Sequence, residues 1–174
     1  GSRGLLGGIG IPRGQVGAPA SGRGKGRQAI YFEPEGKNKG RWVMPSSASR
    51  AASEEADETD DSQVIVRSNG TVTYVGKDIA YQLWKFGLLD RTFNYKEFSR
   101  YADGRILWET TTEDGSPAAP KFGGAKRVYN VIDARQAYLQ KVVKEGLQLL
   151  GHPREAEHSI HFSYEMAALT PDTA

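Results

Sequence analysis

The sequence predicts an α/β fold that contains a parallel sheet, a β-hairpin and an insertion. A β-type run over 127–132, a stretch with helical spacing and a second β-type run over 159–163 follow one another, which is the order of a βαβ unit. Asn69-Gly70 separates two short β-branched runs, as in a hairpin. Residues 88–126 interrupt the pattern with aromatic, glycine and aspartate residues, which indicates an insertion.

Composition limits the classes of protein that the chain can belong to. Its 174 residues are enough for one domain with a core. The absence of cysteine excludes disulfides, thiolate nucleophiles and cysteine-ligated zinc. Mean hydropathy is −0.55, and no apolar run approaches the ~20 residues of a membrane span. We therefore expect a cytoplasmic protein without a membrane partner and without a metal site.

Charge is distributed unevenly along the chain. Residues 1–28 are rich in glycine and carry arginine and lysine without any acid, whereas residues 53–61, "SEEADETDD", carry acids without any base. Such blocks repel themselves and remain solvated. We expect 1–28 to be a disordered arm and 29–174 to be the folded domain. Contact of the arm with RNA phosphates is the alternative.

The first half of the chain predicts short strands and one helix. β-type runs occur at Ile30–Phe32 and Trp42–Met44, followed by a loop over 45–61. "QVIVRSNGTVTYV" predicts a hairpin with a type I′ turn at Asn69-Gly70. The following "KDIAYQLWKFGLL" has helical spacing of its apolar residues, so we expect a helix that starts at Lys77-Asp78 and stops at Gly87.

The second half predicts another hairpin and the βαβ unit. "YADGRILWETTTEDG" favours a turn at Asp103-Gly104 inside the insertion. The strand over 127–132 precedes a helix from about Ala134 to Leu150, which Gly151 ends. "HSIHFSYEM" predicts the last strand.

Residues with useful chemistry cluster at the predicted strand-to-helix turns. Open parallel sheets bind ligands beyond the carboxyl ends of their strands. Tyr74 and Asp78 lie at the first such turn, 132–136 at the second and 161–166 at the end of the last strand. A carboxylate with phenol and amide partners suits a cationic group with several donors, such as a guanidinium.

Each of these residues also has a purely structural interpretation. Asp78 could serve only the first turn of a helix, where an acid stabilises the amino end. Tyr74 could be an ordinary strand aromatic, and Asp133 could be a helix N-cap. The histidines lack metal-ligand spacing, and the sequence has neither a G-x-S-x-G nucleophile motif nor a Walker loop.

Four segments in fixed order resemble the catalytic domain of arginyl-tRNA synthetases, which are class I aminoacyl-tRNA ligases. They are "NKGRWVMPS", "VIVRSNGTVTYVGKDIAYQLWKFGLL", "VYNVIDARQ" and "HFSYEMAALTP", and the similarity covers about residues 28 to 172. The resemblance implies part of a Rossmann-type catalytic domain and a fragment of an arginine–tRNA ligase.

The resemblance also implies roles for particular residues. It assigns arginine binding to Tyr74, Asp78 and Gln136, with the guanidinium on Asp78. It places the ATP side at 161–166, with His161, Tyr164 and Met166. ATP with Mg²⁺ as cofactor and arginine and tRNA as partners are implied by the family in the same way.

The sequence also departs from the family pattern. Neither a HIGH motif nor a KMSKS-type loop occurs in it, so no complete catalytic set is present and we expect these 174 residues alone to be inactive. The alternative function is a non-catalytic module derived from a synthetase that binds RNA or a protein partner.

Overall fold

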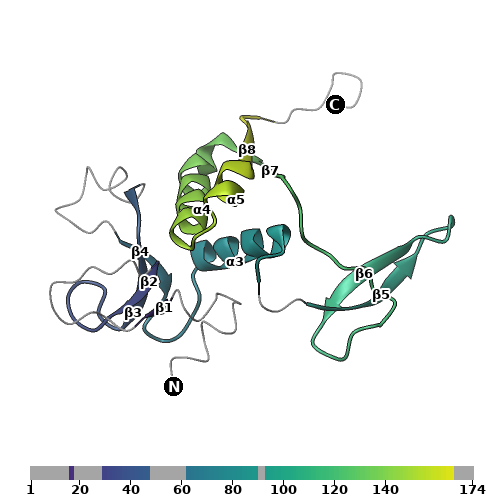
Figure 1. Cartoon of the computed structure of the whole chain (residues 1–174), viewed down its shortest axis with the longest axis horizontal. Helices are drawn as coiled ribbons and strands as arrows, with labels where there is room; N and C mark the ends of the chain where they lie inside the picture. The colour runs from purple at the N-terminus through teal and green to yellow at the C-terminus, as the bar shows by residue number, and fades with distance from the viewer. Residues whose placement is uncertain (1–15, 18–28, 48–61, 90–92, 167–174) are drawn as a thin grey trace.

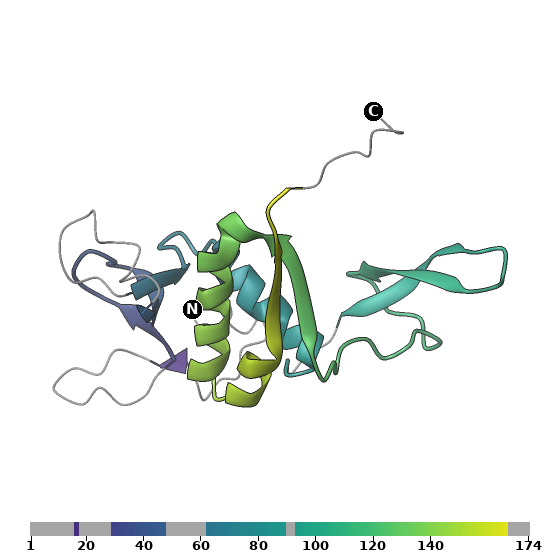
Figure 2. The same cartoon turned by 90° about the horizontal axis from the view of Figure 1, so that it is seen from above.

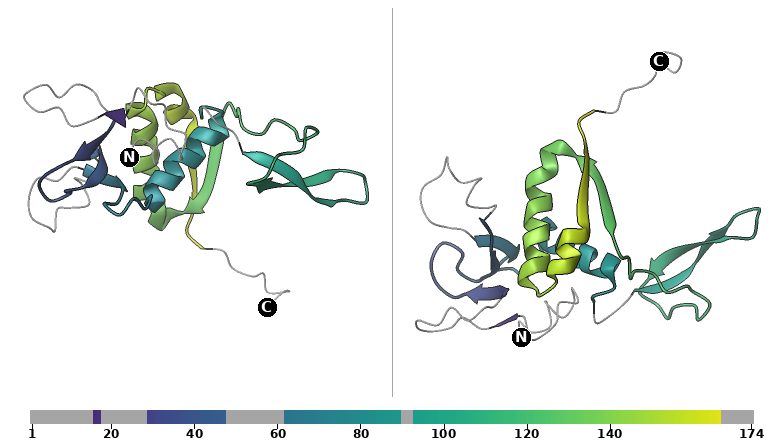
Figure 3. Two further views of the ribbon diagram at one scale, coloured as in Figure 1. Left: turned by 90° about the horizontal axis from the view of Figure 1, so that it is seen from below. Right: turned by 45° about the horizontal axis from the view of Figure 1, so that its top comes forward.

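The structure is a computed structural model that describes residues 16–17, 29–47, 62–89 and 93–166. Its central part contains helices α3, α4 and α5 with strands β7 and β8. A small sheet of strands β1 to β4 lies on one side of this part, and the hairpin of β5 and β6 lies on the other (Figure 1). Figure 3 shows from two further directions that this hairpin projects away from the helices.

The amino-terminal sheet has the order β1-β2-β3-β4, with bounds Val16–Gly17, Ile30–Glu33, Arg41–Pro45 and Ser62–Val66. β1 and β2 are parallel, whereas β2, β3 and β4 pair antiparallel. The two predicted strands at β2 and β3 are confirmed. The expected disordered arm over 1–28 lies outside the described residues except for β1.

The turn after β4 differs from the predicted type I′ hairpin. Its closing hydrogen bond joins Gly70 N to Arg67 O at 2.9 Å, so the central turn residues are Ser68 and Asn69. Gly70 follows with φ 85°, which is the three-residue loop with a glycine in the left-handed region. The expected second strand is reduced to one bridge between Val66 and Val72, because a helix begins directly afterwards.

Helix α3 spans Tyr74–Phe86 and therefore starts three residues before the predicted Lys77. Gly87, with φ 73°, ends the helix as predicted. The prediction that Tyr74 lies on a strand is wrong, because Thr73 is the N-cap and Tyr74 is therefore the first residue of the helix. Tyr74 and Asp78 thus lie on one helix, one turn apart.

The insertion contains the expected second hairpin. β5, Asn94–Arg100, pairs antiparallel with β6, Ile106–Thr111. The turn between them closes through Gly104 N to Tyr101 O at 2.9 Å, and Gly104 has φ 84°.

The βαβ unit is confirmed, with β7 (Val128–Asp133) parallel to β8 (Ser159–Tyr164). Between them lie a 3₁₀ turn, Ala134–Gln136, and helix α4, Ala137–Leu149. A further short helix, α5 (Pro153–His158), lies between α4 and β8, where no element was expected. Proline is favourable at the first position of a helix, because the backbone N–H there would have no partner within the helix. Figure 2 shows α4 beside the two strands.

The expected parallel sheet is therefore only partly present. Among the described residues the parallel arrangement is limited to β7–β8 and the short β1–β2 contact, and the other strand pairs are antiparallel. The α/β content is as predicted. None of the helices in the described ranges is long and apolar enough to cross a membrane.

The core lies where α3 and α4 pack against β3 and β4. Gly146 of α4 makes this close approach possible, since a Cβ there would lie 2.8 Å from Ile79 Cδ1 and 3.4 Å from Met44 Sδ. Fully buried side chains surround this point: Ile30, Met44, Ile65, Ile79, Leu83, Val142, Leu147 and Leu150.

Candidate functional site

Thr73 fixes the position at which α3 begins. Its hydroxyl accepts a hydrogen bond from Gly76 N at 3.2 Å and lies 2.9 Å from Val64 O, to which it can donate. The amino end of α3 is thereby attached to the middle of β4. Tyr74, the first helical residue, projects outward with 81% of its surface exposed.

Asp78 is a half-buried carboxylate with no capping role. It lies beyond the first helical turn, which contains no acid, so the interpretation of Asp78 as a first-turn residue is excluded. No hydrogen bond or ion pair links its side chain to another residue of the described ranges. Partial burial raises the pKa of Asp78, and the positive charge of Lys85 opposes this rise. The helix thus presents an anion whose charge lacks a direct partner.

A polar cluster that the sequence analysis missed connects α3 to the βαβ unit. Lys85 Nζ donates to Asn130 Oδ1 of β7 at 3.0 Å, and Gln82 Nε2 donates to Ser159 Oγ of β8 at 2.8 Å. Gln82 and Asn130 are buried. Gln82 and Lys85 follow Asp78 by four and seven residues, so the helical period could have placed all three on one face.

Strand β4 also positions the start of α4. Tyr138 of α4 donates from its hydroxyl to Gln63 Oε1 at 3.1 Å, whereas Thr73 binds the next residue of the strand, Val64. Consecutive strand residues are only ~3.3 Å apart along the chain. The amino ends of α3 and α4 therefore lie at the same part of β4. Gln136, two residues before Tyr138, is exposed at this position.

The second and third predicted turns meet in space. The parallel register pairs Asp133 with Tyr164, and His161 Nε2 lies 2.9 Å from Ile132 O. The 132–136 segment and the end of β8 are thus neighbours, as the βαβ prediction required. His161 is half-buried and uses one ring nitrogen for this backbone contact, whereas Tyr164 and Met166 are exposed.

Asp133 has the structural role that the sequence suggested as one interpretation. Its carboxylate accepts from Arg135 N at 2.8 Å and pairs with the Arg135 guanidinium at 2.7 Å. These contacts, first of all the side-chain bond from Arg135, lower the pKa of Asp133 to about 2. The carboxylate of Asp133 is therefore already paired with a cation of the protein. Asp78 is the better candidate to bind a cationic ligand.

A hollow of about 520 Å³ lies next to Tyr74. Arg41, Gln63, Arg67 and Thr73 contribute to its walls, but neither Asp78 nor Gln136 does. Tyr74 and Asp78 thus lie one turn apart on α3, and Gln136 lies directly before α4, but this hollow does not enclose all three. The described ranges contain no cluster of residues that could hold a metal ion.

Comparison with known proteins finds arginine–tRNA ligases. The chain is 42% identical over 136 residues to arginine–tRNA ligase of Pyrococcus furiosus, and the aligned region is 78% of this chain and 20% of that ligase. It is 40% identical over 140 residues to arginine–tRNA ligase of Deinococcus radiodurans, and the aligned region is 80% of this chain and 22% of that ligase. No family model matches.

A solved structure supports the same relationship. Arginyl-tRNA synthetase of Thermus thermophilus superposes with a TM-score of 0.59 at 34% identity, covering 79% of this chain and 21% of that one. The predicted resemblance is therefore confirmed. The chain spans about one fifth of the length of the curated relatives that it matches.

Proposed function

We propose that these 174 residues act as the arginine-recognising part of an arginine–tRNA ligase catalytic domain. The observation that carries the proposal is the half-buried carboxylate of Asp78, which lies one turn after Tyr74 and lacks a hydrogen-bond partner among the described residues. Partial burial of an anion without a partner has a cost, and a bound guanidinium would offset that cost. Similarity to arginine–tRNA ligases gives the choice of cation.

In this arrangement Asp78 binds the guanidinium of arginine through charge-assisted hydrogen bonds. The exposed phenol of Tyr74 and the amide of Gln136 approach the rest of the amino acid from the neighbouring helix ends. Lys85 sits seven residues from Asp78 and is held by Asn130. Its positive charge opposes the rise in the Asp78 pKa that burial causes, while its ammonium group donates to Asn130 rather than to the carboxylate.

The ATP side belongs at the joined carboxyl ends of β7 and β8, with His161, Tyr164 and Met166. Tyr164 is exposed there, so a phenol is available to a nucleotide, whereas the guanidinium of Arg135 is paired with Asp133. ATP with Mg²⁺ would supply the activated phosphate when bound, and the exposed ring of Tyr164 would be available to its base. In the described ranges no cluster of residues could hold the metal ion without the nucleotide.

We also assign β7 and β8 to a larger Rossmann-type parallel sheet, with 29–174 as part of that domain and 88–126 as an insertion. Parallel sheets are normally covered on both faces. One face of β7–β8 packs on the helices, while the other exposes a row of apolar side chains: Tyr129, Val131, Phe162 and Tyr164. An exposed apolar row of this kind supports the proposal that other parts of the catalytic domain cover this face.

The family reaction joins arginine and ATP into arginyl-adenylate and then transfers arginine to tRNA. This chain contributes binding and orientation of the amino acid, which lowers the barrier by holding the reacting groups in position. It has neither HIGH nor KMSKS residues, which belong to the phosphate chemistry in the family. A cytoplasmic location fits the same proposal.

Titration of the 174-residue chain with arginine, followed by NMR, tests the proposal. Asp78→Asn keeps the shape but removes the charge, so arginine affinity should fall tenfold or more, as expected for a charge-assisted contact of ~1.5–3 kcal/mol. Asp114→Asn, an exposed change in the insertion, is the matched control and should bind like wild type. Equal binding by wild type and Asp78→Asn would refute the assignment.

The pH dependence gives a second test of the same site. Because burial raises the pKa of Asp78, the carboxylate gains a proton at a higher pH than an ordinary aspartate. Arginine affinity should therefore decrease as the pH falls through that raised pKa. Saturating arginine should in turn lower the pKa, because the guanidinium favours the charged form.

A further inference from the structure

The ammonium group of Lys85 is held by groups that carry no charge. Its Nζ donates to Asn130 Oδ1 of β7 at 3.0 Å and to Gln82 Oε1 at 3.3 Å. It also lies 4.7 Å from the centre of the Tyr81 ring. Because a lysine has three N–H donors, two amide oxygens and one aromatic face are enough to occupy it. We call Asn130, Gln82 and Tyr81 the Lys85 cage.

An anion nevertheless lies on the same helix as Lys85. Asp78 precedes it by seven residues, which is about two helical turns, and Gln82 lies between them. The contact with Gln82 shows that the Lys85 side chain leans towards the amino end of α3, and therefore towards Asp78. Burial lowers the pKa of Lys85, and the negative charge of Asp78 opposes this fall. Within the described ranges no ion pair joins the two.

A single hydroxyl group orients both amides of the Lys85 cage. Ser159 Oγ of β8 accepts from Gln82 Nε2 at 2.8 Å and lies 3.5 Å from Asn130 Nδ2. Because both amide nitrogens are directed at Ser159, both amide oxygens are left to face the ammonium group. Gln82 and Asn130 are buried, so the arrangement is a fixed part of the contact between α3 and the βαβ unit.

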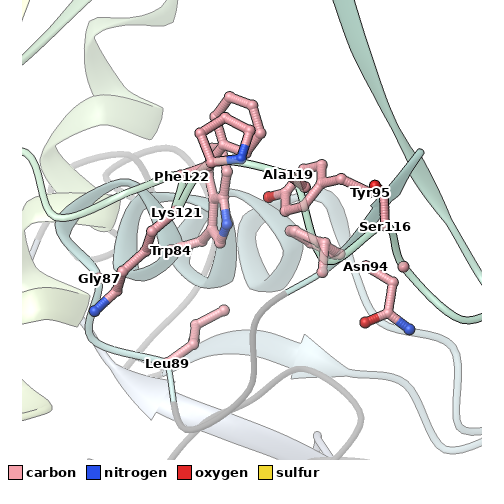
Figure 4. Close-up of a pocket in the computed structure, with 12 residues that line it drawn as sticks. Trp84, Gly87, Leu89, Asn94, Tyr95, Ser116, Ala119, Lys121 and Phe122 are labelled. Atoms are coloured by element: carbon pink, nitrogen blue, oxygen red, sulfur yellow. The ribbon is translucent and has the colours of Figure 1, made fainter. Parts of the chain in front are cut away.

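The aromatic wall of the Lys85 cage is fixed from its other side. The ring of Tyr81 stacks on Trp84, with centroids 5.3 Å apart and an interplanar angle of 5°. Trp84 meets the edge of Phe93 at 5.8 Å and forms part of the wall of a pocket of about 440 Å³ at the junction with the insertion (Figure 4). The insertion therefore supports the position of the Tyr81 ring.

The other titratable residues around Lys85 offer no alternative anion. A hollow of about 420 Å³ borders Lys85, and its other titratable residues are Arg127 and Tyr129. Among the described residues, the charge that acts on the pKa of Lys85 is that of Asp78. A Lys85 side chain released from the Lys85 cage would therefore be drawn towards Asp78.

We infer that the Lys85 cage keeps the carboxylate of Asp78 unpaired, and so available to a cationic ligand. An ammonium group bound to Asp78 would occupy the oxygens that a guanidinium needs. Asn130 and Gln82 prevent this by supplying Lys85 with other acceptors, so they are positioning residues that act through Lys85. The benefit to arginine rests on the proposed function, but the state of Asp78 can be measured without arginine.

The ammonium signal of Lys85 in ¹⁵N NMR spectra of the 174-residue chain gives a test in the wild type. Lys85→Met identifies the signal by removing it. Hydrogen bonds to Asn130 and Gln82 should protect the ammonium protons from exchange with water, compared with those of Lys141, which is exposed on α4. Exchange at Lys85 as fast as at Lys141 would contradict the inference.

The pKa of Asp78 without arginine, measured by NMR titration, tests the Lys85 cage directly. Asn130→Val removes one acceptor and suits a strand. Gln82→Met removes the other and keeps a good helix former of similar length. Either change should free Lys85 to approach Asp78, so the pKa of Asp78 should fall. Two variants on different elements are used because a buried change at either position can impair folding.

Lys85→Met is the matched background for both variants. By itself it should raise the pKa of Asp78, because the opposing positive charge is lost. Adding Asn130→Val or Gln82→Met to Lys85→Met should then leave this pKa unchanged, since the two residues have no ammonium group to hold. A general disturbance of α3 would instead move the pKa in both backgrounds, and that result would overturn the inference.

Titration of the same proteins with arginine separates this inference from the proposed function. Because a freed Lys85 competes with the ligand, arginine should bind to Asn130→Val and Gln82→Met roughly threefold to tenfold more weakly than to the wild type. An Asp78 pKa that stays constant or rises in these two variants would refute the role of the Lys85 cage, even if arginine binds. A falling pKa together with no arginine binding by the wild type would support the Lys85 cage and refute the arginine site.

Discussion

Gly146→Ala should destabilise the contact between α3 and α4. The added Cβ would lie 2.8 Å from Ile79 Cδ1, 3.1 Å from Ile79 Cγ1 and 3.4 Å from Met44 Sδ. Both neighbouring side chains are fully buried, so neither can move into solvent. Helix α3 or the Ile79 side chain must therefore shift.

The size of the effect follows from two opposing terms. Overpacking of a core costs ~1–3 kcal/mol. Replacing a helical glycine by alanine contributes about 0.5–1 kcal/mol in the opposite direction. We expect a net loss of about 1 kcal/mol in the free energy of unfolding, although alanine is the better helix former.

Urea denaturation followed by circular dichroism measures this loss, and Ile79→Val provides the decisive comparison. Alone, Ile79→Val should cost ~0.5–1.5 kcal/mol, because it removes a buried methyl group. In the Gly146→Ala background the same change removes the atom at 2.8 Å and should cost little or raise stability. Simple additivity of the two changes, or a stabilised Gly146→Ala protein, would refute the packing argument.

Three further outcomes are expected. Arg135→Ala should return the pKa of Asp133 from about 2 towards its ordinary value, which an NMR titration measures. In the wild type the ion pair stabilises the fold at pH values above the ordinary aspartate pKa, and this stabilisation is lost as the pH falls towards 2. Lys85→Met should raise the pKa of Asp78 further, since the opposing positive charge is removed, and an unchanged titration would contradict the assigned coupling. The 174-residue chain should show no arginine-dependent ATP–pyrophosphate exchange, even with tRNA added; robust exchange would mean that the phosphate chemistry does not need the missing motifs.

Local patterns in the sequence determined most of the elements. Alternation and helical spacing gave the strands at β2, β3, β7 and β8 and the helix over most of α4, and glycine marked the end of α3. Short-range chemistry decides these features, because backbone conformation and the hydrophobic period depend on residues within a few positions. The resemblance to arginyl-tRNA synthetases likewise rests on contiguous segments.

The start of α3 shows where local pattern was insufficient. Residues 71–75 are β-branched or aromatic and favour a strand, yet helix begins at Tyr74. The Thr73 hydroxyl binds both Gly76 N and the carbonyl of Val64, a residue nine positions earlier. Tertiary contact with β4 therefore overrode β propensity, which is strongly dependent on context.

The tertiary structure decided the burial and the surroundings of Asp78, whereas the partner of Asp133 is local. In the sequence, Asp78 and Asp133 are both acids near a helix start, and both could bind a cation or serve as caps. Asp133 pairs with Arg135, whereas Asp78 lies half-buried, and Lys85, the cation that acts on its pKa, donates to Asn130. Asn130 is 45 residues from Lys85 along the chain. Burial and charge pairing depend on such distant neighbours, so the sequence could name the candidate residues, but only packing could separate a structural carboxylate from one able to bind a ligand.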